Sequence, residues 1–529
     1  SQTCCDDSTM PHMPPLIGLL LITLLSTACQ AQPGYDPGNR PASTALPSPA
    51  EGPIAAGLEQ LHENPEHEGQ SGFYLLHEGL SAFVARVALI EVAQSSLDLQ
   101  YYIVSDDTSS RIIVAKLLEA ADRGVRVRLL VDDLGTRVAE PLVATLEQHP
   151  NIHIRIFNPV AARSGISRAF QMARHFGRTN HRMHNKLMVA DSSVMITGGR
   201  NLGDEYFSNT NVDVQDVDVM AVGKIVPDGV ASFDQYWNTP ASVPINRVLD
   251  ADDADMDLPT LQRTLLRFLD EQKNSEFASA LSGSSLGRRL VEGKVPLDWG
   301  QATLYADPPE KATARDTLSR DDYLGASLKT ILESARQRLQ ISSAYFVPGD
   351  AGVALFSALS ERGVNIGILT NSLSTTDVAI VHSGYVNYRK PLLENGITLW
   401  ELRAEAGQQE RIHWFKGKSR ASLHAKTFVI DDDRTFIGSV NLDGRSILQN
   451  TEIGLLIESE SLNQQLSQLF ASWVSDDSAW HVSLDDEGEL QWQARDADEH
   501  TPLTLDLSLI HISEPTRRYA ISYAVFCLK

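Results

Sequence analysis

The stretch DRGVRVRLLVDD at residues 122–133 recurs in the second half of the chain as SERGVNIGILTN at residues 360–371. In each copy a glycine follows a helical segment and precedes a run of apolar and β-branched residues, which is typical of a buried parallel strand. The strand-like and helical segments that lead into the two copies span residues 97–104 and 112–123, and residues 339–347 and 353–362. The sequence therefore predicts an internal repeat in the order strand, helix, strand.

This repeat sets the expected architecture, because strands that alternate with helices form βαβ units. We expect an α/β fold of two lobes, each a mainly parallel sheet flanked by helices, packed as a pseudo-twofold unit. The first lobe is assigned to residues 54–240 and the second to residues 301–507. Residues 241–300 lack a strand period and carry Leu261 and Leu265 at helical spacing, so we expect a helical connector there.

The first part of the chain has the composition of an export signal. Residues 1–30 contain an apolar run too short to span a bilayer, as in a signal peptide, and residues 1–9 can precede the true start. The run ends at Cys29 in a context that resembles a bacterial lipoprotein cleavage site. Lipidation of Cys29, a plain signal peptide and an uncleaved anchor all stay open. We expect an exported, membrane-associated protein of the bacterial cell envelope, with residues 31–53 as a flexible tether.

Composition narrows the classes of function. The net charge of -23 disfavours a general nucleic-acid binder, because the protein as a whole repels a polyanion. Only Cys4, Cys5, Cys29 and Cys527 are present, which excludes a disulfide framework, a cysteine-bound zinc and a cysteine nucleophile between the two ends. Composition changes abruptly near the end, and we expect residues 508–529 to be a non-native tail outside the fold.

A second pair of matching stretches carries the chemistry, RMHNKLMVAD at residues 182–191 and SLHAKTFVID at residues 422–431. Both fit the pattern HxKxxxxD, through His184, Lys186, Asp191, His424, Lys426 and Asp431. A small residue and an asparagine then follow each histidine at distances of 15 and 17 residues. These residues are Gly199, Asn201, Ser439 and Asn441. Coincidence is improbable for two such matching sets.

Residues of these types favour a phosphodiester site. On a strand, a histidine and the lysine two places on point the same way, so facing lobes bring two imidazoles and two ammonium groups around one phosphate. Asn201 and Asn441 can donate to its remaining oxygens. Because the lysines can neutralise those oxygens, we expect no metal and no cofactor. By strand parity Asp191 and Asp431 face away from the histidines, and we interpret these members of the motif as structural anchors.

These motifs resemble the signature of the phospholipase D superfamily, and the resemblance covers roughly residues 72–504. The stretches RMHNK, GGRNLGDEYF, DVDVMAVG, VHSGYVNYRKPLLENGITLWEL and GSVNLDGRS resemble its bacterial cardiolipin synthase branch, most of all the C-type members. The resemblance implies a phosphatidyltransferase that makes cardiolipin from phosphatidylglycerol with phosphatidylglycerol or phosphatidylethanolamine. It implies a phosphohistidine intermediate, with His184 as the nucleophile and His424 as the general acid and base.

The resemblance also suggests that carboxylates hold the second nitrogen of each imidazole, and we assign this role to Asp218 and Glu452. Three alternatives to transfer stay open: a phospholipase D hydrolase that releases phosphatidic acid, a nuclease, and a non-catalytic envelope protein that binds anionic lipid.

The stretch beginning at Val381 offers donors for an acceptor head group, namely His382, Tyr385, Tyr388 and Arg389. Its alternative interpretation is an amphipathic helix that leads into a strand.

Basic residues gather before His184, although the chain as a whole is acidic. No Asp or Glu occurs between Gln148 and Ala190, and apolar residues recur there at helical intervals, as in helices that lie in a membrane interface. A helix packed on its own lobe explains the pattern equally well. We expect an anionic phospholipid membrane and phospholipid substrates as partners, and no nucleic acid.

Overall fold

The first copy of the repeated stretch forms the centre of a sheet. Strand β2 (Ser96–Tyr101), helix α4 (Thr108–Asp122) and strand β3 (Arg126–Asp132) follow one another in the predicted order. β2 pairs with β3, and β3 with β4 (Ile152–Phe157), in parallel. Gly124 ends the helix at a φ of +96°, in the left-handed region that favours glycine.

The second copy forms the same unit. β11 (Arg338–Ser343), α13 (Gly349–Glu361) and β12 (Asn365–Asn371) repeat the order, and β13 (Thr398–Leu402) takes the place of β4. All three strands are parallel, and Gly363 ends the helix at a φ of +87°. The predicted α/β repeat is therefore confirmed, because each half forms one βαβ unit from its own copy.

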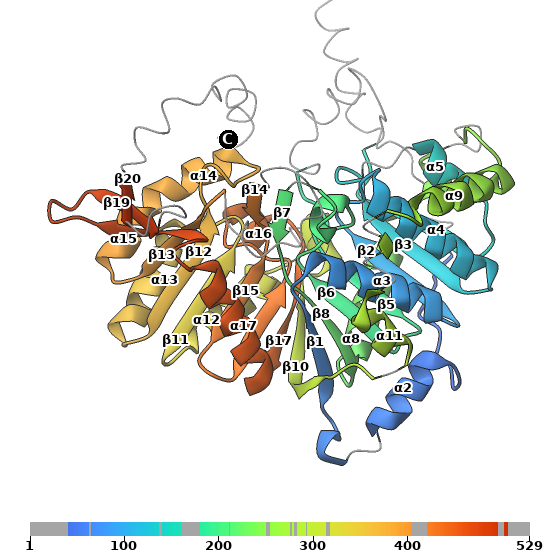
Figure 1. The fold of residues 1–529 in the computed structure, drawn as a ribbon, viewed down its shortest axis with the longest axis horizontal. Coiled ribbons are helices and arrows are strands. Elements are labelled where there is room, and N and C mark those ends of the chain that lie inside the picture. Colours follow the sequence, from blue (N-terminus) through green and yellow to red (C-terminus); the bar gives the residue numbers. More distant parts are fainter. Residues whose placement is uncertain are drawn as a thin grey trace, which may run out of the picture. The chain divides into compact units, whose positions relative to one another are not determined.

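This computed structural model describes residues 41–62, 65–136, 140–160, 180–210, 212–249, 254–275, 278–279, 283–292, 294–313, 318–404, 420–495 and 502–505. From Ala42 onward they belong to one compact unit, in which two lobes lie side by side (Figure 1). The expected signal segment with Cys29, most of the basic stretch before His184 and the expected tail lie outside these residues. No helix in the described part of the chain is long and apolar enough to cross a membrane.

The prediction of mainly parallel sheets is wrong, because the parallel unit supplies only three strands to each lobe. Most of the remaining strands pair antiparallel, and some of them, such as β5 with β6 and β15 with β16, are joined by short turns. In the first lobe these strands are β1 (Ser71–Leu76), β5 (Leu187–Ala190), β6 (Val194–Gly198) and β8 (Asp218–Gly223). In the second lobe they are β15 (Lys426–Ile430), β16 (Arg434–Gly438), β17 (Ile453–Glu458), β18 (Ala479–Leu484), β19 (Leu490–Arg495) and β20 (Pro502–Leu505).

The two lobes share one sheet, which contains 18 strands in the described ranges. β1 pairs with β8 on one side and with β10 (Asp298–Ala306) on the other, and β10 continues into a pairing with β17 (Figure 1). The first residues of β10 lie within the range predicted as connector. A short parallel pair, β7 (Val212–Gln215) with β14 (Arg420–Leu423), joins the lobes a second time.

The predicted connector is partly helical and lies against the first lobe. Within it, α9 (Leu258–Gln272) packs on α4 and α5 (Glu140–Leu146), and α11 (Ser285–Val291) packs on α3 (Gly79–Val92). Leu261 and Leu265 are buried in these contacts, as their spacing predicts. The same range also holds the short strand β9 (Ser242–Pro244), which pairs with β4 and which the sequence pattern does not reveal.

One apolar cluster spans both lobes and fixes them to each other. It contains Trp237 of α8 (Val226–Asn238) and Val189 from the first lobe, with Val429 and Phe470 of α17 (Glu460–Trp473) from the second. Two further clusters fill the lobes separately. The other helices are α2 (Pro53–His62), α12 (Leu324–Glu333), α14 (Ala379–Tyr385), α15 (Arg389–Glu394) and α16 (Gly444–Leu448).

Candidate active site

Each predicted histidine lies in a short segment that is hydrogen-bonded to the other lobe. The backbone N–H of His184 donates to the carbonyl of Thr451 at 2.9 Å, and that of His424 donates to the carbonyl of Gln215 at 2.8 Å. Each histidine lies two or three residues before an antiparallel strand of its own lobe, β5 or β15. The site is therefore built where the two lobes meet.

Each imidazole is held by a carboxylate of the opposite lobe. His184 Nδ1 lies 2.8 Å from Glu452 Oε2, and His424 Nδ1 lies 2.6 Å from Asp216 Oδ2. Because an ionised carboxylate can only accept, this contact places a proton on Nδ1 of each ring. Nε2 is then the ring nitrogen that is available to contact a substrate.

The assignment of Asp218 to an imidazole is wrong, and Asp216 has that role. Each functional carboxylate follows directly after the residue whose carbonyl binds the histidine backbone, which makes Asp216 the equivalent of Glu452. Asp218 pairs with Gly198 in the sheet, and the matching pair in the second lobe is Gly438 with Gly454. The repeat equivalent of Asp218 is therefore a glycine.

Asp218 instead takes part in a buried ion network. It accepts from Arg86 at 2.8 Å, and it lies 3.6 Å from the guanidinium of Arg200. None of the three side chains is more than 2% exposed. Counting along the sequence cannot separate Asp216 from Asp218, because only the register of β7 against β14 shows which of them lies beside His424.

The two lysines lie beside the histidines as predicted. Lys186 Nζ donates to the carbonyl of His184 at 2.6 Å, and Lys426 donates to that of His424. Both side chains are almost fully buried. Burial lowers the pKa of Lys426 to about 8, against the opposing charge of Asp216. Burial also lowers the pKa of Lys186 well below its usual value, with Glu452 opposing.

The small residues after the motifs make room for the carboxylates. A Cβ atom at Gly199 would lie 2.0 Å from Asp216 Oδ1, so the carboxylate occupies that space. At the equivalent position Ser439 Oγ donates to Glu452 Oε2 at 2.5 Å. These two residues therefore contact the carboxylates that hold the imidazoles.

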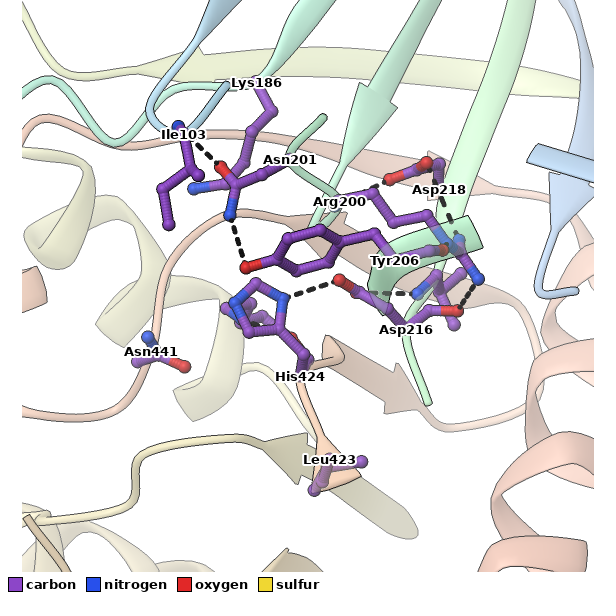
Figure 2. A network of polar contacts seen from close by, with 12 residues as sticks. Ile103, Lys186, Arg200, Asn201, Tyr206, Asp216, Asp218, Leu423, His424 and Asn441 are labelled. Atoms are coloured by element: carbon purple, nitrogen blue, oxygen red, sulfur yellow. Dashed lines mark hydrogen bonds and ion pairs between the residues drawn. The ribbon is translucent and has the colours of Figure 1, made fainter. Parts of the chain in front are cut away.

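The two asparagines are fixed through their carboxamide oxygens. Asn201 Oδ1 accepts from the backbone of Ile103 at 3.2 Å, and Asn441 Oδ1 accepts from the backbone of Tyr345 at 3.4 Å. Asn201 Nδ2 donates to the hydroxyl of Tyr206 at 3.0 Å (Figure 2). These bonds fix the orientation of both amides, and Tyr206 links Asn201 to His424.

Two tyrosines of the first lobe border the histidines, and the motif spacing does not reveal them. The ring of Tyr102 meets His184 edge-on with centroids 5.1 Å apart, and the ring of Tyr206 meets His424 in the same way at 5.2 Å. The only signal for Tyr206 in the sequence is its place within GGRNLGDEYF, directly after Asn201 and its loop.

The motif aspartates bind the backbone, away from the imidazoles, as strand parity predicts. The Asp191 carboxylate accepts from the N–H groups of Gln94, Ser95 and Ser96 at distances from 2.8 to 3.1 Å. Asp431 accepts in the same way from residues 336–338 and also pairs with Arg434. Each aspartate thus anchors the turn before β2 or β11.

The predicted acceptor residues lie inside the second lobe. Arg389 donates to Glu401 at 2.7 Å, bonds to His382 at 3.1 Å and lies over the rings of Tyr385 and Trp492. His382, Tyr385 and Arg389 are all buried. Tyr388 packs against the apolar cluster that fills the second lobe. Their interpretation as head-group donors is therefore not supported, because the guanidinium is already paired within the fold.

The two halves of the site differ electrostatically. Burial lowers the pKa of His184 well below its usual value, and the charges of Lys186 and Lys426 lower it further. Burial and Lys426 also lower the pKa of His424, but Asp216 opposes them. Burial by itself would raise the pKa of Asp216, but His424, Lys426 and Arg200 together outweigh it and hold that pKa far below its usual range. In contrast, burial raises the pKa of Glu452.

No group of three or more His, Cys, Asp and Glu side chains suited to a metal ion occurs within the described ranges. What the site does offer is two imidazoles, two ammonium groups and two amides, a donor set suited to a phosphate.

Several known proteins are similar to this chain in sequence or in fold. A family model described as "Cardiolipin synthase, PLD-like domain" matches residues 87–237 and 328–474. Cardiolipin synthase C of Escherichia coli (strain K12) is 40% identical over 439 residues, which cover 82% of this chain and 90% of that protein. Cardiolipin synthase A of Pseudomonas entomophila (strain L48) is 26% identical over 402 residues, covering 75% and 67%. The crystal structure of phosphatidylserine synthase from Haemophilus influenzae Rd KW20 matches with a TM-score of 0.50 at 12% identity, covering 79% and 89%.

The duplicated lobes and their shared histidine pair define a two-lobed phospholipase D-like protein. The two ranges of the family match lie one in each lobe, and the match to cardiolipin synthase C runs through most of both. The chain belongs to the cardiolipin synthase family of phospholipase D-like proteins.

Proposed function

We propose that this protein is a phosphatidyltransferase that makes cardiolipin from phosphatidylglycerol, with phosphatidylglycerol or phosphatidylethanolamine as the second lipid. The observation that carries the proposal is the reciprocal pairing of His184 with Glu452 and of His424 with Asp216. It supplies two oriented imidazoles with different electrostatic surroundings, which a two-step transfer through one phosphorus atom needs.

In the first step, neutral His184 attacks phosphorus through Nε2. The bond from phosphorus to the leaving alcohol breaks, and the alcohol oxygen takes a proton from the His424 imidazolium. The low pKa of His184 supports its role as the nucleophile, because that ring is neutral at working pH. The pKa of His424 is lowered less, because its contact with Asp216 opposes the effect of burial, and this supports His424 as the acid.

In the second step, a hydroxyl of the acceptor phosphatidylglycerol loses its proton to His424. Its oxygen forms the new bond to phosphorus, and the phosphorus to nitrogen bond breaks with its electron pair returning to His184. Lys186 and Lys426 offset the charge on the phosphate oxygens in both steps.

The different surroundings of the carboxylates explain why the two rings divide these roles. Glu452 also accepts from the hydroxyls of Ser439 and Ser446. These two bonds offset part of the carboxylate charge, so less of it acts on His184. Asp216 Oδ2 binds His424, while Oδ1 accepts from the backbone N–H of Val217 at 2.8 Å. The imidazolium form is therefore better supported on His424.

Both substrates are membrane lipids, so the protein works at an anionic phospholipid surface of the bacterial cell envelope under this proposal. Lipid mass spectrometry after incubation with vesicles of phosphatidylglycerol and phosphatidylethanolamine tests it, with His184→Ala as the inactive control. We expect cardiolipin to form faster than phosphatidic acid. Phosphatidic acid as the main product would make the protein a phospholipase, and no turnover of either lipid would contradict both functions.

A further inference from the structure

Arg200 is a buried cation placed between two site residues in the sequence, Gly199 and Asn201. Its side chain is fully buried, whereas the equivalent residue in the second lobe is the apolar Val440. The guanidinium donates to four backbone carbonyl groups at distances from 2.6 to 3.1 Å. These carbonyl groups belong to Leu76, His77, Tyr206 and Asp216.

Two of these four residues contact His424. Asp216 binds Nδ1 of the ring, and the ring of Tyr206 packs edge-on against it. Arg200 bonds to the backbone of Asp216 at 2.6 Å and of Tyr206 at 3.1 Å, so one rigid guanidinium ties both together (Figure 2). The backbone N–H of Arg200 donates to Asp218 Oδ1 at 3.1 Å, and this bond fixes Arg200 in turn.

We infer that Arg200 is a positioning residue for the acid and base step, acting on His424 through Asp216 and Tyr206. The inference rests on the proposed function, because it assigns proton transfer to His424. A proton is transferred efficiently only over hydrogen-bond distance, so a small displacement of the ring slows that step more than it slows attack at phosphorus.

The second lobe supports the other histidine with a different cation. Lys311 is fully buried and donates to Asp307 at 2.8 Å and to the carbonyl of Ser446 at 3.3 Å. Ser446 follows Asn441 by five residues, as Tyr206 follows Asn201. Asp307 accepts from the backbone N–H of Glu452 at 2.9 Å, so this pair supports the His184 half of the site.

The test compares two leaving groups in the Arg200→Lys variant. Release of glycerol from phosphatidylglycerol needs a proton from His424, whereas nitrophenolate leaves phosphatidyl-p-nitrophenol without one. Single-turnover release of each alcohol is measured on full-length protein. We expect Arg200→Lys to slow glycerol release at least about tenfold more than nitrophenol release, since general acid catalysis contributes about 10² to 10⁴. Equal slowing of both would overturn the inference.

Arg86→Lys is the matched control, because it also removes a buried guanidinium from Asp218. Arg86 binds Tyr101 and the carbonyl of Ala82, not the residues around His424, so both release rates should fall by the same factor. Lys311→Arg should likewise slow both alcohols alike. A selective loss in the Arg86→Lys control would also count against the inference.

If Arg200→Lys does not fold, as judged by thermal unfolding, Asp218→Asn replaces it. That variant keeps the guanidinium but removes the charge paired with it, and the same selective loss is expected. A uniform loss, or none, rejects the role of Arg200. Wild-type protein that releases neither alcohol contradicts the proposed function itself. Normal wild-type release with uniform slowing in the variants contradicts this inference alone.

Discussion

His184 and Glu452 lie 268 residues apart in the sequence and in different lobes, yet His184 Nδ1 is 2.8 Å from Glu452 Oε2. His424 and Asp216 repeat the relationship in the opposite direction at 2.6 Å. Each lobe therefore supplies the histidine of one pair and the carboxylate of the other. Neither lobe contains a complete acid and base system without its neighbour.

Replacement of Glu452 by Gln should lower kcat for cardiolipin formation about 10²- to 10⁴-fold, as when the orienting carboxylate of a catalytic histidine becomes an amide. The amide no longer fixes the proton on Nδ1 of His184. Steady-state kinetics on mixed vesicles measures this effect. Glu458→Gln, on the exposed end of the same strand, is the control and should leave kcat near that of the wild type. A Glu452→Gln variant with more than half of wild-type kcat would contradict the assigned role.

The His424→Ala variant should accumulate a phosphatidyl group on His184 when it is given phosphatidyl-p-nitrophenol. The first step can proceed because nitrophenolate needs no proton, but the second lacks its base. Peptide mass mapping locates the adduct. The His184→Ala/His424→Ala double variant should stay unlabelled. A label on any residue other than His184 would contradict the role of His184 as the nucleophile.

Binding of a divalent anion should weaken as the pH rises through about 8, the pKa of Lys426. Below that pKa the ammonium is charged and attracts the anion, and above it the charge is lost. Inhibition by sulfate, whose own charge is constant in this range, reports the change as a rising inhibition constant. Lys426→Arg keeps its charge and should lose this step. An inhibition constant that does not change through pH 8 in the wild type would contradict a phosphate-neutralising role.

Asp191→Ala should lower the free energy of unfolding by about 2 to 4 kcal/mol, because three backbone N–H groups lose a charged acceptor. Asp191→Asn retains one acceptor oxygen and should cost less. Thermal or urea unfolding measures both. If Asp191→Ala lowers kcat by orders of magnitude while stability is unchanged, the carboxylate acts in the chemistry and not as an anchor.

Spacing along the sequence predicts the site residues whose positions depend only on the fold of their own lobe. The histidines, lysines and asparagines recur at equal intervals in both halves, and a shared fold brings equal intervals to equivalent places. Asp216 escapes this reasoning because its position beside His424 depends on the pairing of β7 with β14 across the lobes. Gly454, the true equivalent of Asp218, shows how a shift of two residues misleads when the strand register is unknown.

The prediction that residues of the stretch from Val381 bind an acceptor head group is unsupported for a different reason. A helix with histidine, tyrosine and arginine looks suited to binding, but the sequence does not show which face turns inward. Arg389 meets Glu401 of β13 in the interior of the lobe. The sequence also does not reveal that the sheet is mixed. Short antiparallel strands such as β5 and β6 carry continuous apolar runs that resemble those of buried parallel strands.

The pairing of β1 with β10 makes the sheet continuous from one lobe to the other. Many enzymes with two lobes open and close by rotation about a flexible joint, but a joint made of ladder hydrogen bonds and a shared apolar cluster resists such rotation. We therefore expect the spacing of His184 and His424 to be set during folding and to stay the same through the catalytic cycle. The departing and arriving alcohols then exchange past two fixed rings, and we expect the rate of turnover to depend on the movement of lipids and not on movement of the lobes.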